Sequence, residues 1–126
     1  ITSGMNANMK NSESVMHDGS VLEYSRINNI TIQAWSPFQH GFFKGSYIDN
    51  DEFPELNKKL AEIGVKYGLT KTGVVSAWIL RHPAKMQLIA GTMTPSRLTE
   101  ICKGADVTLS RSEWYEIYRS AGHCLP

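Results

Sequence analysis

The chain has 126 residues, the size of one ordinary domain. Hydrophobic residues at 41% and charged residues at 20% match average globular usage, which argues against a disordered, collagen-like or membrane-embedded chain. Thirteen Lys and Arg against twelve Asp and Glu give a formal net charge of +1, so the chain lacks the basic excess with which proteins bind nucleic-acid phosphates. Nucleic acid is therefore not an expected partner.

The two cysteines, Cys102 and Cys124, form no CxxC pair and stand at no zinc-ligand spacing from a histidine. We expect two reduced thiols in a cytoplasmic protein, with no metal site. No apolar run approaches the roughly 20 residues of a membrane-spanning helix, and the first residues lack the order of a secretory signal. Membrane contact is not expected.

The first elements are a loop, a short helix and a strand. Residues 1–19 are polar without an apolar period, which predicts a loop, and the start at Ile1 indicates the middle of a longer polypeptide or a processed terminus. Residues 20–28 are typical of a short helix that ends at two asparagines. The β-branched and aromatic run 30–35 predicts a strand, which Pro37 stops because proline cannot continue a ladder.

Residues 38–53 have the composition of a long loop. Its aromatic residues Phe42, Phe43 and Tyr47 can wall a ligand pocket or pin the loop to the body of the protein, and the second interpretation is favoured. Helices follow wherever an N-cap or an N-terminal proline precedes an apolar stripe. These helices start at Pro54, Thr70, Thr94 and Ser110 and stop at Gly68, Pro83, Gly104 and Gly122. Met86–Ala90 is a short buried strand between the second and third of them.

A helical crossover joins the two predicted strands, so they should be parallel. Two parallel strands leave both sheet edges and at least one face uncovered, which is too little for a complete α/β domain. Either further strands hide in residues 1–20 or the chain is part of something larger, and the polar composition of that opening favours the second explanation.

The sequence contains no HExxH, Walker, GxGxxG or GxSxG motif. Tyr67 and Lys71 have the YxxxK spacing of hydride-transfer enzymes, but Gly68 should end the helix between them, so we reject this pair as a site. His82 is expected to bond the last carbonyls of its helix rather than act as a base. Two other histidines are expected to be solvated: His40 and His123.

Two segments that follow the strands are better candidates for a site, residues 35–39 and residues 91–97 with Glu100. Ligands of parallel α/β proteins bind at the carboxyl ends of strands, where helix N-termini attract anions. A strand, the pair Gly91 and Thr92, a capped helix start and Arg97 can cradle one phosphate. A capped helix with a solvated arginine explains the same pattern equally well.

Three segments resemble the aldo-keto reductase family: 34–38, 78–83 and 89–100. The resemblance is closest to bacterial oxidoreductases of its YdhF-like branch and extends from about residue 5 to the end. It implies the C-terminal portion of a (β/α)8 TIM barrel, an α/β fold, with strand 7 at Ile30–Trp35 and strand 8 at Met86–Ala90. The shortage of strands is then explained.

The resemblance also implies NADP as cofactor and the reduction of aldehydes or ketones to alcohols. The implied cofactor-binding residues are Trp35, Ser36, Phe38, Gln39, Gly91, Thr92, Met93, Arg97 and Glu100. Trp35 would stack on the nicotinamide ring, and the next three would line the pyrophosphate. The three residues after strand 8 would hold the adenosine phosphate, Arg97 the 2′-phosphate and Glu100 the adenine amino group. Ile101 replaces an asparagine of many relatives.

The family's catalytic Asp, Tyr, Lys and His come from the first half of the barrel, so no catalytic residue is assigned in this sequence. The expected function is cofactor binding in a reductase whose missing N-terminal half performs the proton transfer. Two alternatives stay open. The chain can be a non-catalytic α/β interaction module that completes its sheet with a partner chain or with itself, or a degenerate barrel that only binds nucleotides.

Overall fold

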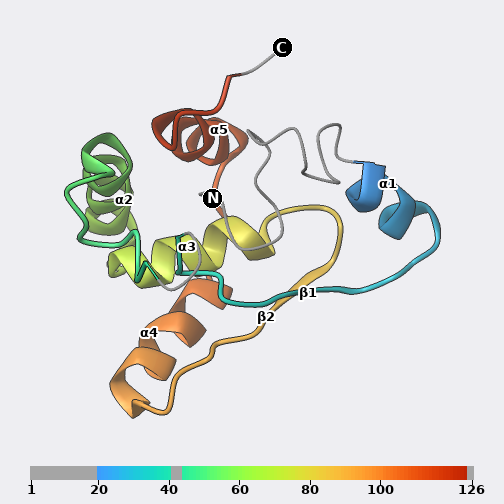
Figure 1. Ribbon diagram of the computed structural model, residues 1–126, viewed down its shortest axis with the longest axis horizontal. Coiled ribbons are helices and arrows are strands. Elements are labelled where there is room, and N and C mark those ends of the chain that lie inside the picture. The colour runs from blue at the N-terminus through green and yellow to red at the C-terminus, as the bar shows by residue number, and fades with distance from the viewer. Residues whose placement is uncertain (1–19, 41–43, 125–126) are drawn as a thin grey trace.

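The computed structural model describes residues 20–40 and 44–124. The predicted loop 1–19 lies outside the described residues, as do Phe42 and Phe43. The elements are α1 (Ser20–Ile27), β1 (Ile32–Ala34), α2 (Pro54–Tyr67), α3 (Lys71–Leu80), β2 (Met86–Leu88), α4 (Pro95–Ala105) and α5 (Arg111–Ser120). The described part is therefore an α/β structure with the predicted order of elements (Figure 1).

The two strands pair in parallel, which confirms the expectation from the helical crossover. Ile32 lies opposite Met86, and Ala34 lies opposite Leu88. The strands run side by side in Figure 1, and α2 and α3 lie between them in the sequence. Among the described residues each strand has the other as its only partner, so both outer edges of this sheet are unpaired.

Both strands are shorter than the predicted runs 30–35 and 86–90. The N–H of Ile30 donates to the carbonyl of Ser25 at 2.8 Å, so it closes the end of α1 instead of joining a ladder. At the other end of β1, Ser36 is left-handed with φ 48° and turns the chain away from the sheet. Local hydrogen bonds and backbone turns thus limit the ladder to three residues a strand.

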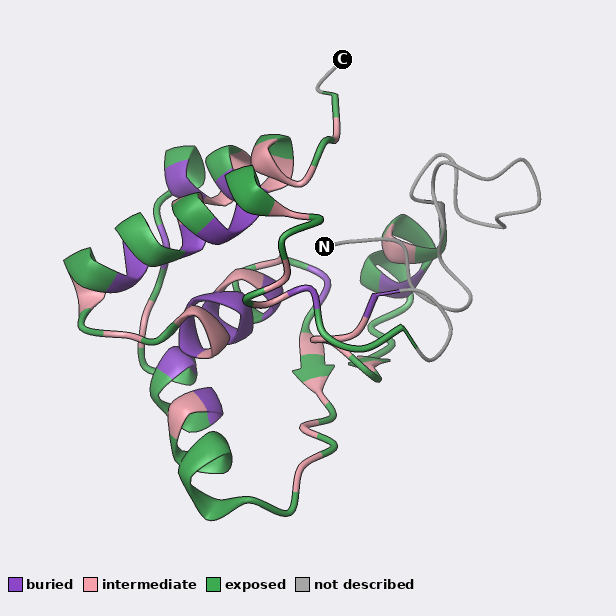
Figure 2. Ribbon diagram, turned by 60° about the vertical axis from the view of Figure 1, so that its left-hand side comes forward, coloured by how far each residue is buried: buried purple, intermediate pink, exposed green. Residues whose placement is uncertain are grey.

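The hydrophobic core surrounds α3, which packs against α2, α4 and β2. Figure 2 shows buried residues over most of α3 and on the inner faces of α2 and α5, while α1 and the start of α4 are largely exposed. A helix with apolar residues on all sides is stable only when neighbours cover several of its faces. The core side chains are Tyr47, Leu56, Leu60, Ile63, Val74, Val75, Ala77, Ile79, Leu109 and Ile117.

Gly104 lies inside α4 and does not stop it, contrary to the expectation, because the helix continues through Ala105. A Cβ atom at position 104 would overlap the carbonyl oxygen of Gly73 in α3 and would lie 2.8 Å from Cβ of Ser76. The glycine therefore lets the backbones of α3 and α4 touch. This close approach sets the position of α4 relative to the sheet.

Glu113 joins the end of α2 to the start of α5. It completes the predicted capping box with Ser110, and its carboxylate accepts hydrogen bonds from the Ser110 N–H at 2.7 Å and the Tyr67 hydroxyl at 2.8 Å. Lys66 forms an ion pair with the same carboxylate at 2.5 Å. Gly68, left-handed with φ 65°, ends α2 directly after Tyr67, so the rejection of the YxxxK pair is consistent with the structure.

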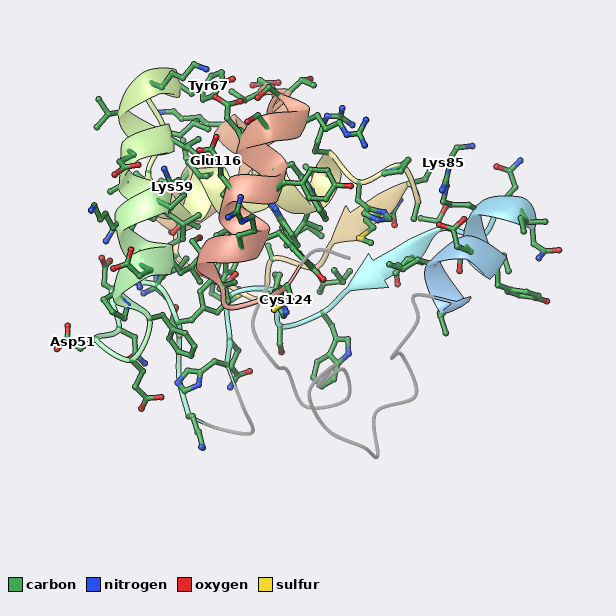
Figure 3. All side chains as sticks on the ribbon, turned by 90° about the horizontal axis from the view of Figure 1, so that it is seen from above. Asp51, Lys59, Tyr67, Lys85, Glu116 and Cys124 are labelled. Atoms are coloured by element: carbon green, nitrogen blue, oxygen red, sulfur yellow. The ribbon has the colours of Figure 1, made fainter. Side chains whose placement is uncertain are left out.

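A second, exposed link joins the same two helices. Lys59 of α2 lies 3.4 Å from Glu116 of α5, and the two labelled side chains lie between the helices in Figure 3. Lys59 also pairs with Glu62 on its own helix at 2.6 Å. Exposed pairs of this kind contribute little to stability.

The expectations for the histidines were wrong at two positions. His40 is buried rather than solvated, because its ring packs edge-on against Phe53 with 5.0 Å between the centroids. His82 does not bond the last carbonyls of its helix: its Nδ1 accepts the N–H of Ala84 at 3.1 Å. His123 is half-buried and stacks on Tyr118 at 4.6 Å.

Within residues 20–40 and 44–124, no helix is both long enough and apolar enough to cross a membrane. The same residues contain no group of three or more His, Cys, Asp or Glu side chains that can hold a metal ion.

Candidate functional site

A cavity of about 690 Å³ opens where β1 and β2 end and α4 begins. Its volume falls within the range of small-molecule and cofactor sites. Eight of the nine candidate residues line it, namely Trp35, Ser36, Phe38, Gln39, Gly91, Thr92, Arg97 and Glu100. The ninth, Met93, does not line the cavity and is 98% exposed. The fold thus brings two segments that are distant in sequence into one site.

The first wall of the cavity is the turn after β1. Ser36 adopts the left-handed region, which is unusual for a residue with a side chain, and its carbonyl accepts the N–H of Gln39 at 3.1 Å. The chain reverses at the end of the strand, and Trp35, half-exposed, lies at the cavity. An exposed indole at the tip of a parallel strand is available to stack on a ring.

The loop that continues this wall is held down by Tyr47. Its side chain is 1% exposed, and its hydroxyl donates to the carbonyl of Pro37 at 2.7 Å. Burial raises the pKa of Tyr47 far above its ordinary value, so the hydroxyl keeps its proton and remains a donor. For this residue, pinning of the loop is the role that the structure supports.

Asn57 of α2 fastens the same loop, and the sequence analysis missed it. Its side-chain amide donates to the carbonyl of Tyr47 at 2.8 Å and accepts the N–H of Asp49 at 2.8 Å. Lys71 at the start of α3 pairs with the Asp49 carboxylate. The only hint in the sequence is that Asn57 stands beside Leu56 in the first turn of an amphipathic helix, and its burial is known from the structure alone.

Tyr47→Phe should lower the free energy of unfolding by about 1–2 kcal/mol, because the partly buried carbonyl of Pro37 loses its donor. Urea unfolding followed by circular dichroism measures this difference. Tyr24→Phe is the matched control, since Tyr24 is 62% exposed and its loss of a hydroxyl should stay within about 0.5 kcal/mol. Equal effects of the two variants would contradict the anchoring role.

The second wall follows β2. Gly91 is left-handed with φ 59°, and a Cβ atom there would meet only the carbonyl oxygen of Ile89, at 3.9 Å, so the chain leaves open room beside it. Thr94 occupies the N-cap position of α4 as predicted, but its side chain makes no capping hydrogen bond. The Thr92 hydroxyl instead accepts the N–H of Thr94 at 3.2 Å. The first N–H groups of α4 therefore have no side-chain cap.

The charged side chains of the cavity are arranged along α4. Arg97 lies in its first turn and makes no ion pair with a described residue. Glu100, one turn further, accepts a hydrogen bond from the Thr70 hydroxyl at 3.3 Å, and the buried side chain of Ile101 lies beside it. Among the described lining residues Arg97 is the one Lys or Arg. The Asp49 carboxylate, which also lines the cavity, pairs with Lys71 and not with Arg97, so Arg97 keeps its positive charge free.

This arrangement can bind a ligand, and among the described lining residues the side chains of the usual proton-donor types are the carboxyl groups of Asp49 and Glu100. None of the described residues that line the cavity is a His, Tyr, Lys or Cys. An indole at one wall, uncapped backbone N–H groups and a guanidinium at the other suit an elongated ligand with a ring and an anionic group.

Comparison with known proteins identifies the family of this chain. The model of the aldo/keto reductase family matches residues 5–121. A 6-dehydroglucose reductase of Agrobacterium fabrum is 34% identical over 101 residues, which cover 79% of this chain and 32% of that protein. A 6-dehydroglucose reductase of Novosphingobium aromaticivorans is 26% identical over 83% of this chain and 34% of its own length. Aldo-keto reductase str7 of Strobilurus tenacellus is 27% identical over 75% of this chain and 34% of its own length.

The chain belongs to the aldo/keto reductase family, an oxidoreductase family that generally uses NAD(P)H. The fold of the family is a (β/α)8 barrel, and the two parallel strands of this chain with their helices are consistent with part of such a barrel. The chain spans about a third of the length of the curated relatives it matches.

Proposed function

We propose that this chain supplies the NADP-binding portion of a reductase that converts aldehydes or ketones to alcohols. One observation carries the proposal: the turn after β1 and the start of α4 line a single cavity at the carboxyl ends of two parallel strands. Parallel α/β barrels bind their ligands at this end. Family membership makes a nicotinamide dinucleotide the ligand of first choice.

The residues at the cavity fit such a cofactor. Trp35 would lie against the nicotinamide ring, and the turn through Gln39 would follow the pyrophosphate. Near Gly91, where no side chain fills the space, the uncapped N–H groups of α4 would receive a phosphate. When bound, the nicotinamide supplies hydride to the carbonyl carbon of the substrate.

Selection of NADPH over NADH would rest on α4. Arg97 has no carboxylate partner among the described residues, so its guanidinium is available to a 2′-phosphate, which it matches by two parallel hydrogen bonds. Glu100, which Thr70 orients by a hydrogen bond, would accept from the adenine amino group. Adenosine 2′-phosphate carries both a phosphate and an amino group, and Arg97 and Glu100 lie about one turn apart on the same helix at the cavity.

In the same proposal β1 and β2 are strands 7 and 8 of the barrel, and the proton donor belongs to β/α units outside this sequence. The names of two relatives make an oxidised sugar the first carbonyl substrate to test. The free, exposed thiols of Cys102 and Cys124 favour a reducing compartment, and we propose the cytoplasm.

A fluorescence titration tests the cofactor assignment. Arg97→Ala should weaken NADPH binding at least tenfold and leave NADH binding within twofold, because one charge-assisted contact to the extra phosphate contributes roughly 1.5–3 kcal/mol. Arg119→Ala, an exposed arginine of α5 that does not line the cavity, is the matched control. Equal losses for both cofactors, or for both arginines, would refute the role of Arg97.

A second variant tests the contact with the nicotinamide ring separately from the contact with the 2′-phosphate. Trp35→Phe should remove the part of the fluorescence change that comes from this indole and should weaken NADPH and NADH equally, since both carry the nicotinamide ring. Trp78 and Trp114 stack on each other at 4.7 Å and lie outside the cavity, so their emission serves as the internal reference. If the unsubstituted chain binds neither NADPH nor NADH, the proposed function is refuted.

The second candidate, an interaction module, is favoured by the unpaired edges of the sheet. Edge strands of this kind recruit further strands from the same polypeptide or from another chain. Analytical ultracentrifugation distinguishes the candidates: self-association that is independent of NADPH favours the module, and a monomer that binds NADPH favours the reductase.

A further inference from the structure

A second cavity, of about 350 Å³, lies apart from the first. Three arginines, one histidine and two aromatic side chains form most of its lining, and none of its described lining residues is acidic. Arg81 and His82 precede β2 and Arg26 precedes β1, so this cavity lies toward the strands' N-terminal ends, whereas the first lies at their carboxyl ends. The two sites share no residue.

Arg81, at the C-cap of α3, is fixed in place without being neutralised. Its Nε donates to the carbonyl of Leu109 at 3.0 Å, so the two terminal nitrogens of the guanidinium are left over. It forms no ion pair with a described residue. A guanidinium held by its Nε with a free terminal edge is suited to bidentate contact with an anion.

Arg111, the first residue of α5, contributes the second unneutralised charge. Its guanidinium lies over the ring of Tyr115, 5.8 Å from the centroid, and it too has no carboxylate partner in the described part of the chain. Arg81 and Arg111 border the same cavity, so both add positive charge to it that an anion can neutralise. A stacked ring orients Arg111 without reducing its charge.

The remaining lining groups define how much negative charge the cavity can accept. Arg26 is matched by Glu23, which accepts from it with both carboxylate oxygens, at 3.1 and 3.2 Å. Burial, and then the charge of Arg26, lower the pKa of His82, so its ring is neutral at pH 7. Because Nδ1 of His82 accepts the Ala84 N–H, the proton of the neutral ring lies on Nε2, which is a donor. The two unmatched positive charges are those of Arg81 and Arg111.

We propose that this cavity binds a phosphate monoester of a small, soluble molecule. A phosphate monoester carries about two negative charges at neutral pH, which equals the unmatched charge of Arg81 and Arg111. Guanidiniums bind phosphate oxygens in pairs, and the cavity has room for a compact ligand but not for a dinucleotide. Trp114 lines the cavity and stacks with Trp78 and Tyr118, and its Nε1–H donates to the Trp78 carbonyl at 3.0 Å, so the indole offers mainly apolar surface to the body of the ligand.

Calorimetric titration with phenyl phosphate tests the proposal. It is done in the Arg97→Ala background, so that binding at the first cavity does not contribute and failure here leaves the reductase proposal untouched. Saturable binding is expected, with an affinity roughly tenfold lower after Arg111→Ala or Arg81→Gln, because each removes a charge-assisted contact. Arg119→Ala, on α5 but outside the cavity, should leave the affinity unchanged.

Arg81→Gln also removes the hydrogen bond to the Leu109 carbonyl and can therefore impair folding. If Arg81→Gln does not fold, the result for Arg111→Ala decides the test. Benzoate, which has the same ring and a single charge, should bind more weakly than phenyl phosphate. Benzoate binding of equal strength, an equal loss with Arg119→Ala, or binding to phosphatidic acid vesicles without saturable binding of phenyl phosphate would each overturn the proposal.

Discussion

Gly104→Ala is expected to destabilise the protein by about 3 kcal/mol or more. The added methyl group would overlap the carbonyl oxygen of Gly73 and lie 2.8 Å from Cβ of Ser76, both on α3. Neither neighbour is the flexible end of a side chain, so α4 itself has to move. Urea unfolding monitored by circular dichroism gives the difference in free energy of unfolding.

The consequence extends to the cofactor site, because α4 carries Arg97 and Glu100 to the cavity. A displaced α4 should therefore weaken NADPH binding as well as stability. Lys103→Ala is the matched control: it is the exposed neighbour of Gly104 on the same helix and should change stability by less than about 0.5 kcal/mol. If Gly104→Ala changes the free energy of unfolding by less than about 0.5 kcal/mol, the backbones of α3 and α4 do not touch at Gly104 as described.

Glu113→Ala should also lower the free energy of unfolding, by about 3 kcal/mol. The substitution removes the capping box of α5, which contributes about 1 kcal/mol, and leaves the Tyr67 hydroxyl and the Ser110 N–H without their acceptor. Glu113→Gln keeps an acceptor and a capping side chain but removes the charge that Lys66 pairs with. Glu113→Gln should therefore lower the free energy of unfolding by less than Glu113→Ala does.

The carboxylate of Glu113 also makes the stability of the fold depend on pH. Burial by itself raises the pKa of Glu113, but the contacts with Lys66, Ser110 and Tyr67 outweigh it and hold the pKa at about 2, below the ordinary 4.5. A group with a depressed pKa in the folded state stabilises the fold above its unfolded pKa and ceases to do so as the pH falls. The contribution of Glu113 is thus complete above about pH 4.5 and is lost between there and pH 2.

The difference in unfolding free energy between the unchanged protein and Glu113→Gln measures that contribution. It should be constant from pH 7 to about pH 5 and shrink toward zero near pH 2. Glu116→Gln is the control, because Glu116 is exposed and its pair with Lys59 contributes little at any pH. A difference for Glu113 that does not change with pH would mean that its charge is not stabilised in the fold.

Much of the secondary structure could be predicted because its signals are local. Pro54 and Gly68 bound α2 as expected, since one residue suits the first helical turn and the other tolerates a left-handed end. Ser110 and Glu113 form the capping box that their spacing indicates. The parallel pairing followed from the helical crossover, which is a topological argument and needs no distances.

Other features could not be predicted because they depend on contacts between distant segments. His40 was expected in solvent, and the ring of Phe53 buries it. Gly104 has the pattern of a helix stop, and only the approach of α3 shows that its missing side chain is a packing requirement. Asn57 carries no motif, yet its amide holds the loop above the cavity.

The candidate site divides in the same way. By itself the sequence determined which residue types stand at the strand ends, the aromatic Trp35 after one and the cationic Arg97 after the other, because each follows from its own short segment. Only the tertiary structure decided that the two lie on one cavity and that Met93 does not. The physical reason is that pairing of β1 with β2, and the contact of α4 with α3, set the distance between segments whose local signals are independent of each other.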